Sequence, residues 1–574
     1  MRGVTNLEIA ARFAAIADML EILGEGGFRS VSYQRAARIL EDLPQDAEDL
    51  VAQGRLGEIP GIGEALAEKI EEYVRTGRIA YHDELRASLP PGLLQLLDVP
   101  GLGPKKVRVL WQEVGVSDLD TLQKSAETHR LRRIKGFGEK TEENILRGIR
   151  LVREGQSRIL LSVAASVADR VLEHLRANAS VNRASVAGSL RRMRETVGDI
   201  DLLVAAEDRE SVVRAFTTMS GVREVVAAGD TKATVRYDAG GRLVQLDLRI
   251  LDPDSWGAGL LYFTGSKDHN IRLRGMAVDR DLKLNEYGIF RDEEKVASLS
   301  EEDVYAALDL PWIPPEMRED RGEIALALEG RLPTVVDLTH IQGDFHVHTE
   351  ATDGTEPLER MVASAKARGY AYVGISDHSV SLQVARGLTA EQVLAHRDAI
   401  RALNRDGQGI TVLAGTECDI LDGGAMDYPD EVLKELDFAI ASVHSKFNLP
   451  RKEMTDRVVA AARNPYVSIL AHPTTRKIGA RGPIDAGFDD VYAACASSET
   501  AIEINADPYR MDLDDAHARA AKEASCVFAL DTDAHASQDL AWMRFAVGLA
   551  RRAWLAPDDV VNTWPLERVR AFFR

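Results

Sequence analysis

Two aspartates stand at the centre of the segment GSLRRMRETVGDIDLLV, which covers residues 188–204. Asp199 and Asp201 open DIDLLV, a run typical of a β-strand, and side chains two apart on a strand point to the same face. Two adjacent carboxylates repel each other, which raises one pKa, whereas divalent cations turn that repulsion into coordination. An Asp-x-Asp pair alone is more often a solvated turn, so its interpretation depends on the neighbouring residues.

The neighbouring residues are of types that bind phosphate. Gly188 and Ser189 form a compact turn whose N–H groups and hydroxyl suit phosphate oxygens, and Arg191-Arg192 add forked cationic donors. Divalent metal, phosphate and paired carboxylates are the components of in-line displacement at phosphorus. The segment therefore predicts a metal-dependent phosphoryl-transfer site.

The same segment resembles the palm motif of family X DNA polymerases, within the nucleotidyltransferase superfamily. The matching residues are Gly188, Ser189, Arg191, Arg192, Gly198, Asp199 and Asp201. The resemblance implies a third metal carboxylate on a later strand, and Asp247 in LVQLDLRI is the match. Gln245 stands where some relatives carry an arginine, so we expect the tuning of the site to differ. The implied cofactor is Mg²⁺ or Mn²⁺, held by the three aspartates.

The resemblance also implies a binding site for an incoming dNTP. The segment YFTGS (262–266) is similar to the family segment that packs against the sugar and base, and Asn270 and Arg274 would face the nascent base pair and template. Alone, this segment could be any apolar turn. Because it follows the three aspartates that match the palm motif, it supports the resemblance to family X polymerases. The implied nucleotide contacts are Gly188, Ser189, Arg192, Gly198, Tyr262, Phe263, Gly265, Asn270 and Arg274.

A loose repeat in the N-terminal third places Gly-apolar-Gly before a helix three times, in IPGIGEALAEKI (59–70), VPGLGPKKVRVL (99–110) and IKGFGEKTEENI (134–145). One such turn is usually only a loop, whereas three copies resemble helix-hairpin-helix elements, which hold the DNA backbone without reading sequence. The expected DNA contacts are Gly61, Gly63, Gly101, Gly103, Lys105, Gly136 and Gly138, with further phosphate contacts from Lys106, Arg108, Arg132, Arg133, Lys135 and Lys140.

Lys69 lies at the position of the Schiff-base lysine in the small lyase domain of the same family. Schiff-base chemistry requires a deprotonated amine, and a surface lysine on a helix is an equally good interpretation. The second, helper lysine of the family is Ala65 here, which argues against efficient abasic-site lyase activity.

Beyond residue 341, short apolar strands alternate with helical segments, and most of these strands end in polar residues. This pattern predicts an irregular parallel (β/α)7 barrel with its chemistry at the carboxyl ends of the strands. Six of the chain's thirteen histidines are among the candidate ligands. Nitrogen and carboxylate ligands without thiolate suit Zn²⁺, Mn²⁺ or Fe²⁺. The candidate ligands are His346, His348, Asp353, His378, Glu417, His444, His472, Asp533 and His535.

All nine positions match the pattern of the polymerase and histidinol phosphatase (PHP) superfamily, which this segment resembles. The resemblance implies two or three Mn²⁺ or Zn²⁺ ions, with Glu417 as a bridge, and metal-assisted attack on a phosphorus centre. Arg476 and Lys477, which follow His472-Pro473, are either phosphate contacts or ordinary surface charges.

The length of the chain and the proline-rich, charged segment between residues 311 and 336 indicate a multidomain protein. It has an α-helical N-terminal part, an α+β palm and thumb, and the barrel. The expected boundaries are a lyase-like domain at 1–85, helical fingers at 86–155, the palm at 156–255, the thumb at 256–318, a linker at 319–340 and the PHP domain at 341–574. No apolar run is long enough for a membrane span, and no signal peptide or cysteine framework is evident. We expect a monomer in the cytoplasm.

The net charge of −20 argues against a simple nucleic-acid binder. The distribution weakens this objection, because residues 101–158 hold thirteen Lys and Arg against eight Asp and Glu. The combined motifs predict a DNA polymerase that fills short gaps in gapped or primed DNA and carries a metal-dependent 3′–5′ exonuclease, with abasic-site or 3′-phosphate cleavage as further options. Two alternative functions are a repair nuclease with weak DNA synthesis and a scaffolding protein whose barrel metals only stabilise the fold.

Overall fold

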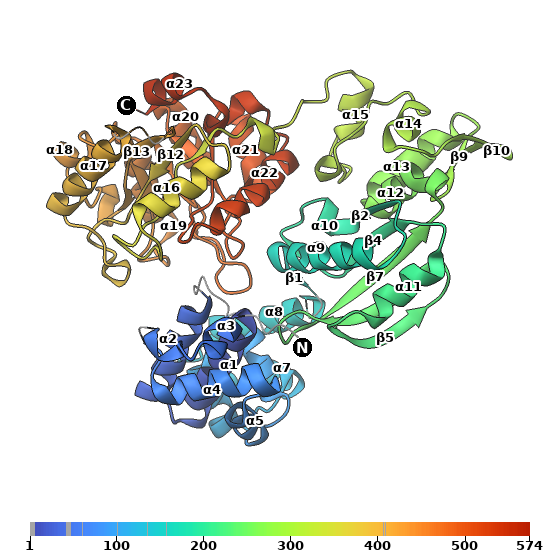
Figure 1. Cartoon of the computed structure of the whole chain (residues 1–574). Coiled ribbons are helices and arrows are strands. Elements are labelled where there is room, and N and C mark those ends of the chain that lie inside the picture. Colours follow the sequence, from blue (N-terminus) through green and yellow to red (C-terminus); the bar gives the residue numbers. More distant parts are fainter. Residues whose placement is uncertain are drawn as a thin grey trace.

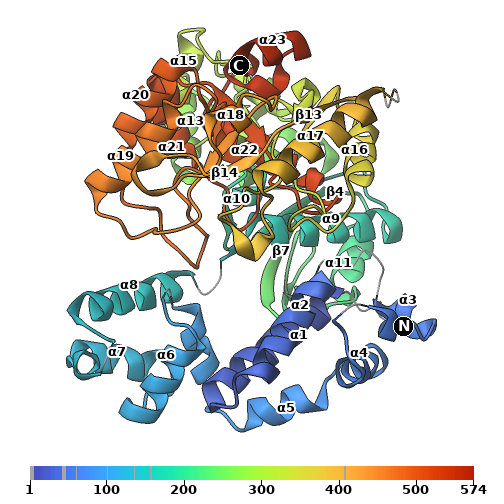
Figure 2. The same cartoon turned by 90° about the vertical axis from the view of Figure 1, so that its left-hand side faces the viewer.

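The chain forms an N-terminal group of helices, a mixed sheet with an attached helical region, and a C-terminal parallel barrel (Figure 1). The computed structural model describes residues 6–41, 47–59, 61–99, 101–134, 136–155, 158–405, 407 and 409–573. Viewed from a second direction, the helices of the N-terminal part lie below the other two parts (Figure 2). Together these parts confirm the predicted fold class.

The N-terminal part is a set of short helices around an apolar core of its own. Helices α1 and α2 pack together, with the rings of Phe13 and Tyr33 edge to face at 5.5 Å. In each of the three hairpins the second glycine accepts the first hydrogen bonds of a helix, as Gly63, Gly103 and Gly138 do for α4, α6 and α8. The helices are α1 (Asn6–Leu23), α2 (Phe28–Glu41), α3 (Ala47–Ala52), α4 (Glu64–Thr76), α5 (Ala80–Ala87), α6 (Pro104–Val109), α7 (Leu119–Glu127) and α8 (Glu139–Gly155).

The palm is a five-stranded sheet in the order β2-β4-β7-β6-β5. Strands β4 and β7 are parallel neighbours, while the other pairs are antiparallel. Its strands are β2 (Arg183–Val186), β4 (Ile200–Ala205), β5 (Val222–Ala228), β6 (Lys232–Asp238) and β7 (Leu243–Leu251), and a small pair is formed by β1 (Ile159–Leu160) and β3 (Thr196–Val197). Its helices are α9 (Leu161–Asn178), α10 (Gly188–Arg191) and α11 (Arg209–Thr218).

The thumb follows the palm and surrounds a buried ion pair. Arg318, fully buried, donates to Glu301 (Nη1···Oε1, 2.6 Å), and the pKa of this carboxyl stays well below its usual range because Arg318 and Arg191 outweigh the effect of burial. The elements are α12 (Trp256–Thr264), α13 (Lys267–Val278), β8 (Lys283–Asn285), β9 (Gly288–Arg291), β10 (Glu294–Ala297), α14 (Glu301–Ala306) and α15 (Glu323–Leu328).

The segment 319–340, predicted as a linker, packs against the thumb. It contains α15, whose Ile324 and Ala327 are buried in the same apolar cluster as Leu308 and Ile313. The charged and proline-rich composition suggested a linker, but two apolar residues three apart on one helical turn are enough to dock it.

The C-terminal part is a parallel barrel of seven strand segments. Strands β13 and β14 belong to one segment interrupted at residues 415–416, and a bridge between Val347 and Ala534 joins the first and last segments. The strands are β11 (Gly343–Asp344), β12 (Tyr372–Ile375), β13 (Thr411–Ala414), β14 (Glu417–Asp419), β15 (Ile440–Ser442), β16 (Ile469–Leu470), β17 (Ala501–Asn505) and β18 (Phe528–Asp531). The helices are α16 (Leu358–Ala367), α17 (Ala390–Arg405), α18 (Asp430–Leu433), α19 (Arg451–Ala462), α20 (Phe488–Ser498), α21 (Asp515–Glu523), α22 (Met543–Arg552) and α23 (Leu566–Phe572).

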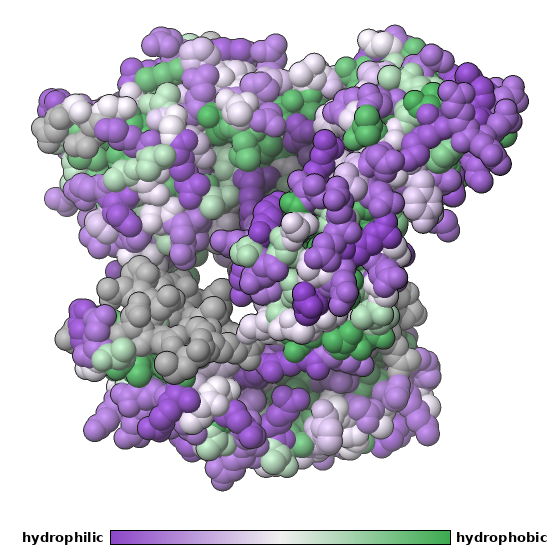
Figure 3. Space-filling view, turned by 45° about the vertical axis from the view of Figure 1, so that its right-hand side comes forward, coloured by the Kyte–Doolittle hydropathy of each residue, from purple (hydrophilic) through white to green (hydrophobic). Residues whose placement is uncertain are grey.

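Aromatic rings fill one end of the barrel, which leaves the opposite end for polar side chains. Phe345 is fully buried and lies 5.4 Å from Tyr372, 6.1 Å from Phe438 and 4.8 Å from Phe573, ring centre to ring centre. On the face of the molecule shown in Figure 3, the coloured surface is largely hydrophilic with small apolar patches. Within the described ranges, every helix is too short or too polar to cross a membrane.

Two candidate metal centres

Three carboxylates converge at one end of the palm sheet. Asp201 on β4 lies directly opposite Asp247 on β7 in the parallel register, and Asp199 immediately precedes β4. Each of the three offers an oxygen within 4.8 Å of the others. Sequence spacing had placed two of them on one face, and strand pairing adds the third.

The electrostatics of this cluster favour a cation. Burial, with the negative charges of Asp199 and Asp247, raises the pKa of Asp201 to about 7. Asp247 accepts hydrogen bonds from Thr234 (Oγ1···Oδ1, 2.6 Å) and from Gln245 (Nε2···Oδ2, 2.7 Å). These two donors orient the carboxylate. The role of Thr234 could not be predicted from the sequence, because its position opposite Asp247 depends on the pairing of β6 with β7.

The Gly188 turn packs directly against these carboxylates. Gly188 has a φ of +56°, and a Cβ placed on it would lie 2.0 Å from Oδ2 of Asp201. The preceding residue, Ala187, donates its N–H to the Asp201 carbonyl at 2.8 Å. Glycine is required here both for the left-handed backbone and for this close approach. Ser189 follows in α10, and Gly198 lies between β3 and Asp199.

Arg192, the expected triphosphate contact, is engaged by protein groups. Its Nη1 donates to the Thr264 carbonyl at 2.5 Å, and its Nε donates to Glu319 at 3.2 Å. Glu319 also accepts from Arg552 of the barrel (Nη1···Oε1, 2.9 Å), and Arg552 donates to the Arg192 carbonyl at 2.8 Å. A nucleotide triphosphate would compete with Glu319 for this guanidinium.

The remaining expected nucleotide contacts lie on α12 and α13 and at Gly265 between them, directly after the palm. Gly265 is close enough to Arg192 that an added Cβ would lie 3.2 Å from its Nη1. Asn270 donates to the Tyr262 carbonyl at 2.7 Å, and its buried Oδ1 has no hydrogen-bond partner among the residues that the structure describes. Arg274 donates to the Asn270 carbonyl at 3.3 Å, and the ring of Phe263 lies edge to face with that of Tyr262.

The helix-hairpin-helix glycines adopt one repeated backbone geometry. Gly61, Gly101 and Gly136 have φ values of +95°, +85° and +93°. Among the described residues, nothing lies within 4 Å of a Cβ added to Gly63, Gly101, Gly103, Gly136 or Gly138, whereas one added to Gly61 would lie 2.7 Å from Cδ1 of Ile39. The described residues therefore leave the second and third turns open at the helix start, while the first is covered at Gly61. Lys105 is exposed.

Several basic residues of the N-terminal part have partners within the chain. Arg132 donates to the buried Glu142 at 2.7 Å, and Lys106 donates to the Gly101 carbonyl at 2.8 Å. Lys69 donates to the Ala65 carbonyl at 3.1 Å and lies 5.6 Å from the centre of the Tyr81 ring. Lys135 lies outside the described residues.

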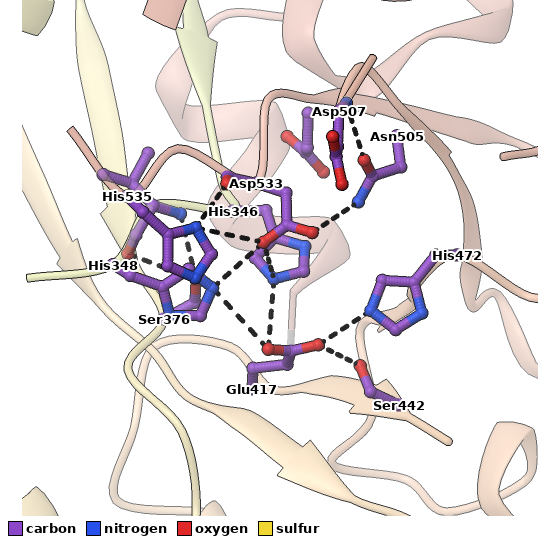
Figure 4. A network of polar contacts seen from close by, with 12 residues as sticks. His346, His348, Ser376, Glu417, Ser442, His472, Asn505, Asp507, Asp533 and His535 are labelled. Atoms are coloured by element: carbon purple, nitrogen blue, oxygen red, sulfur yellow. Dashed lines mark hydrogen bonds and ion pairs between the residues drawn. The ribbon is translucent and has the colours of Figure 1, made fainter. Parts of the chain in front are cut away.

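Eight of the nine predicted barrel ligands fall into overlapping groups, and the ninth, His472, joins them through Glu417. Figure 4 labels six of the nine: His346, His348, Glu417, His472, Asp533 and His535. Glu417 lies at the centre of this cluster, 2.8 Å from His378 (Oε2···Nδ1), 3.3 Å from His444 and 3.0 Å from His472 (both Oε1···Nε2). Glu417 Oε2 also lies 3.3 Å from His346 Nε2 and 3.6 Å from His348 Nε2, and Oε1 accepts a hydrogen bond from Ser442 Oγ at 2.6 Å. Although burial opposes it, the neighbouring histidines hold the pKa of Glu417 well below its usual range. A central carboxylate among imidazoles is the arrangement expected of a bridging ligand.

Two further carboxylates complete the cluster on its other sides. Asp533 lies 3.5 Å from His346 and 3.3 Å from His348 (Oδ1 to Nε2 in both), while Asp353 lies 3.4 Å from the Nε2 atoms of His378 and His535. The ligand groups that lie within 4.8 Å of one another are His348-Asp353-His378-His535, His346-His348-Asp533 and His378-Glu417-His444. Three such groups of ligands are consistent with two or three bound ions.

The unsatisfied atoms of this cluster fit bound metal. Among the described residues, buried nitrogens without a hydrogen-bond partner include Nε2 of His346, both ring nitrogens of His348 and Nδ1 of His472. Burial lowers the pKa of His348, and burial with the charge of Arg510 lowers that of His472 to about 3. Neutral imidazoles with free lone pairs are the form that binds divalent cations.

An outer set of carboxylates orients the histidines and was missed in the sequence. Glu503 on β17 contacts His346 (Oε1···Nδ1, 2.5 Å), and Asp419 on β14 contacts His444 (Oδ1···Nδ1, 2.6 Å). Such partners fix the tautomer and the ring orientation of a ligand. Asp419 lies two residues after Glu417 on one strand, so its spacing was a usable signal; the role of Glu503 depends on barrel closure.

Arg476, one of the two suggested phosphate contacts, joins the barrel to the palm instead. Its guanidinium donates to Glu195 of the palm at 2.7 Å and to the carbonyls of Arg510 and Met511. Two more contacts join the same parts, Arg552 at the Arg192 carbonyl and Arg544 at Asp169 (3.1 Å). The palm segment around Arg192 and Glu195 is thus packed against the barrel.

The fold and the two centres define a nucleotidyltransferase palm joined to a phosphoesterase barrel. Family models match the chain as "DNA polymerase beta thumb" (residues 259–319), "Helix-hairpin-helix domain" (4–79), "SAM-like Helix-hairpin-helix tandem" (93–151) and "PHP domain" (344–502). The chain is 35% identical over 573 residues to "DNA polymerase/3'-5' exonuclease PolX" of Bacillus subtilis (strain 168), covering 99% of each chain.

Other relatives match parts of the chain. "DNA polymerase lambda" of Rattus norvegicus is 23% identical over 342 residues, covering 55% of this chain and 56% of the relative. A "Probable phosphatase" of Acetivibrio thermocellus is 31% identical over 166 residues, covering 28% of this chain and 64% of the relative. The chain belongs to the family X DNA polymerases that carry a C-terminal PHP domain.

Proposed function

We propose that this protein is a DNA polymerase that fills short gaps during repair and a 3′–5′ exonuclease that trims the same 3′ ends. The observation that carries the first activity is the convergence of Asp199, Asp201 and Asp247 beside the Gly188 turn. The Bacillus relative, a "DNA polymerase/3'-5' exonuclease PolX" that aligns over 99% of both chains, supports both proposed activities.

At the palm, the three carboxylates would hold Mg²⁺ or Mn²⁺, which supplies charge stabilisation for in-line transfer from a dNTP. Asp247, oriented by Thr234 and Gln245, would accept the proton of the primer 3′-hydroxyl. Ser189 and the backbone of Gly188 and Gly198 would bind phosphate oxygens at the start of α10 and before β4.

The remaining nucleotide contacts would come from the palm and thumb. Arg192 would exchange its Glu319 partner for the triphosphate. Tyr262, Phe263 and Gly265 would pack on sugar and base, with Asn270 and Arg274 beside the base pair. The hairpin turns and Lys105 would hold the flanking duplex by its backbone. Lys69 remains a candidate for abasic-site lyase chemistry.

At the barrel, the nine ligands would hold two or three Mn²⁺ or Zn²⁺ ions, which supply Lewis acidity for hydrolysis at phosphorus. Glu503 and Asp419 keep His346 and His444 in the orientation that ligation requires. Abasic-site or 3′-phosphate cleavage would use the same centre. We further propose a monomer in the cytoplasm; the three unpaired, buried cysteines agree with a reducing compartment.

A gapped duplex assayed with and without dNTPs, in Mg²⁺ and in Mn²⁺, tests both activities together. Asp247→Ala should abolish extension and leave shortening intact, whereas His346→Ala should do the reverse. If both activities survive either change, the assignment of the two centres is wrong.

One observation favours a second candidate, a repair nuclease with weak synthesis. Arg192 already has two protein partners, so triphosphate binding requires the loss of an ion pair. The same gapped-duplex assay decides between them, because the nuclease alternative requires shortening to exceed extension at saturating dNTP.

A further inference from the structure

Three consecutive loops at the ligand end of the barrel carry cations and aromatic rings. Phe447 follows β15, Lys477 and Arg481 follow β16, and Tyr509 and Arg510 follow β17. The loops are joined: the Arg481 guanidinium lies 3.8 Å from the Phe447 ring centre, Lys477 and Arg481 form a backbone bridge, and the N–H of Ile478 donates to the Tyr509 carbonyl at 2.7 Å. They form one continuous surface.

This surface reaches the metal cluster through Arg510. The Arg510 Nε lies 3.7 Å from Oδ2 of the candidate ligand Asp533 and 3.5 Å from Asp507, and it is buried without a hydrogen-bond partner among the described residues. An unsatisfied guanidinium nitrogen next to a phosphoesterase centre is suited to a phosphate oxygen.

The charge of this side contrasts with the rest of the barrel mouth. The loop after β11 carries Glu350, Asp353 and Glu356, and the segment from 341 onward has 35 acidic against 25 basic residues. Lys477 is exposed, and Arg510 and Arg481 lie near enough that they add to burial in lowering its pKa. A polyanion would therefore approach the centre from this side.

The aromatic side chains indicate a single strand. Tyr509 is 61% exposed, and Phe447 already carries a stacked guanidinium on one face. Aromatic platforms beside phosphate-binding cations are the pattern of sequence-tolerant single-strand binding, because every base has a face that can stack. A paired end would keep its bases away from such platforms.

We propose that Phe447, Lys477, Arg481, Tyr509 and Arg510 form the subsite for the last nucleotides of a single-stranded 3′ end that the barrel hydrolyses. Arg510 binds the phosphate next to the centre, Lys477 binds the phosphate before it, and the Phe447–Arg481 pair and Tyr509 stack on bases. This inference rests on the proposed exonuclease function and assigns the residues that would hold its single-stranded substrate.

The kinetic test uses the full-length protein with Mn²⁺ and no dNTP, on a single-stranded oligonucleotide. Lys477→Ala and Arg510→Ala should each raise KM about tenfold and reduce the slope of log(kcat/KM) against log[salt] by about 0.7, the value for one phosphate contact on a single strand. Arg510→Lys should recover part of the loss. Lys452→Ala is the matched control, since Lys452 is 86% exposed on the same domain and paired with Asp456.

A small ester and a crosslink separate the subsite from the metal centre. Lys477→Ala and Tyr509→Ala should lose less kcat/KM on bis(p-nitrophenyl) phosphate than on the oligonucleotide, because that ester is too short to reach them. In metal-free buffer, an oligonucleotide with 5-iododeoxyuridine next to its 3′ end should crosslink to Tyr509 on irradiation, and Tyr287→Ala, which removes an exposed tyrosine of the thumb, should not alter the yield.

Unchanged KM and salt slope in these variants, or equal losses on the small ester, would overturn the subsite. A fully paired 3′ end hydrolysed as fast as a single strand would overturn the substrate assignment. If wild-type protein hydrolyses no DNA, the proposed exonuclease fails, while the crosslink still tests the subsite on its own.

Discussion

Replacing Gly188 with alanine probes the packing that positions the palm carboxylates. An alanine Cβ would lie 2.0 Å from Oδ2 of Asp201, well under the 3.0 Å that real contacts respect, so this carboxylate must move by about 1 Å. The left-handed backbone, with a φ of +56°, adds about 1 kcal/mol of strain. A displacement of about 1 Å at a reacting group lowers rates by roughly 100-fold.

The assay is single-nucleotide addition to a primed template, with kcat and KM measured separately. Gly188→Ala should lower kcat about 100-fold, because Asp201 rather than the bound nucleotide is displaced, while hydrolysis at the barrel keeps its wild-type rate. Gly275→Ala is the matched control: nothing lies within 4 Å of its added Cβ in helix α13, so extension should be unchanged and stability equal or up to ~1 kcal/mol higher. Wild-type extension by Gly188→Ala would refute the reasoning.

Three further changes test the interface, the N-terminal core and the barrel. Arg552→Ala removes the hydrogen bonds to the Arg192 carbonyl and to Glu319, and in steady-state extension it should change the KM for dNTP by about tenfold. Arg544→Ala, which breaks only the contact with Asp169 on the palm, should leave this KM unchanged. Burial and the charge of Glu21 raise the pKa of Asp18 to about 6, above its unfolded value, so the free energy of unfolding falls as pH rises from about 4 to 6. Asp18→Asn should therefore raise the free energy of unfolding, measured in urea, by about 1–2 kcal/mol at pH 8 and change it little at pH 4. Metal removal by chelation should lower the melting temperature of the barrel, by an amount equivalent to about 4 kcal/mol at a metal concentration 1,000 times Kd, and re-addition of Mn²⁺ should restore it.

Local spacing accounts for much of what could be read in the sequence. Asp199 and Asp201 share a strand face, and His346-x-His348 places two ligands on one segment, because a two-residue period is a property of the extended backbone itself. The first glycine of each hairpin could be found for a similar reason, since the turn before the helix takes a positive φ there, as at Gly61, Gly101 and Gly136. Resemblance supplied Asp247, which no local pattern linked to the other two aspartates.

Contacts between distant segments were decided only by the tertiary structure. Arg192 and Glu319 are 127 residues apart, and Arg476 and Glu195 are 281 apart, so their pairing follows from how thumb and barrel dock on the palm. The sequence alone determined the types of groups and their local direction, because backbone periodicity is local. Which charges meet, and therefore whether an arginine is available to a ligand or already paired, depends on packing across the whole chain.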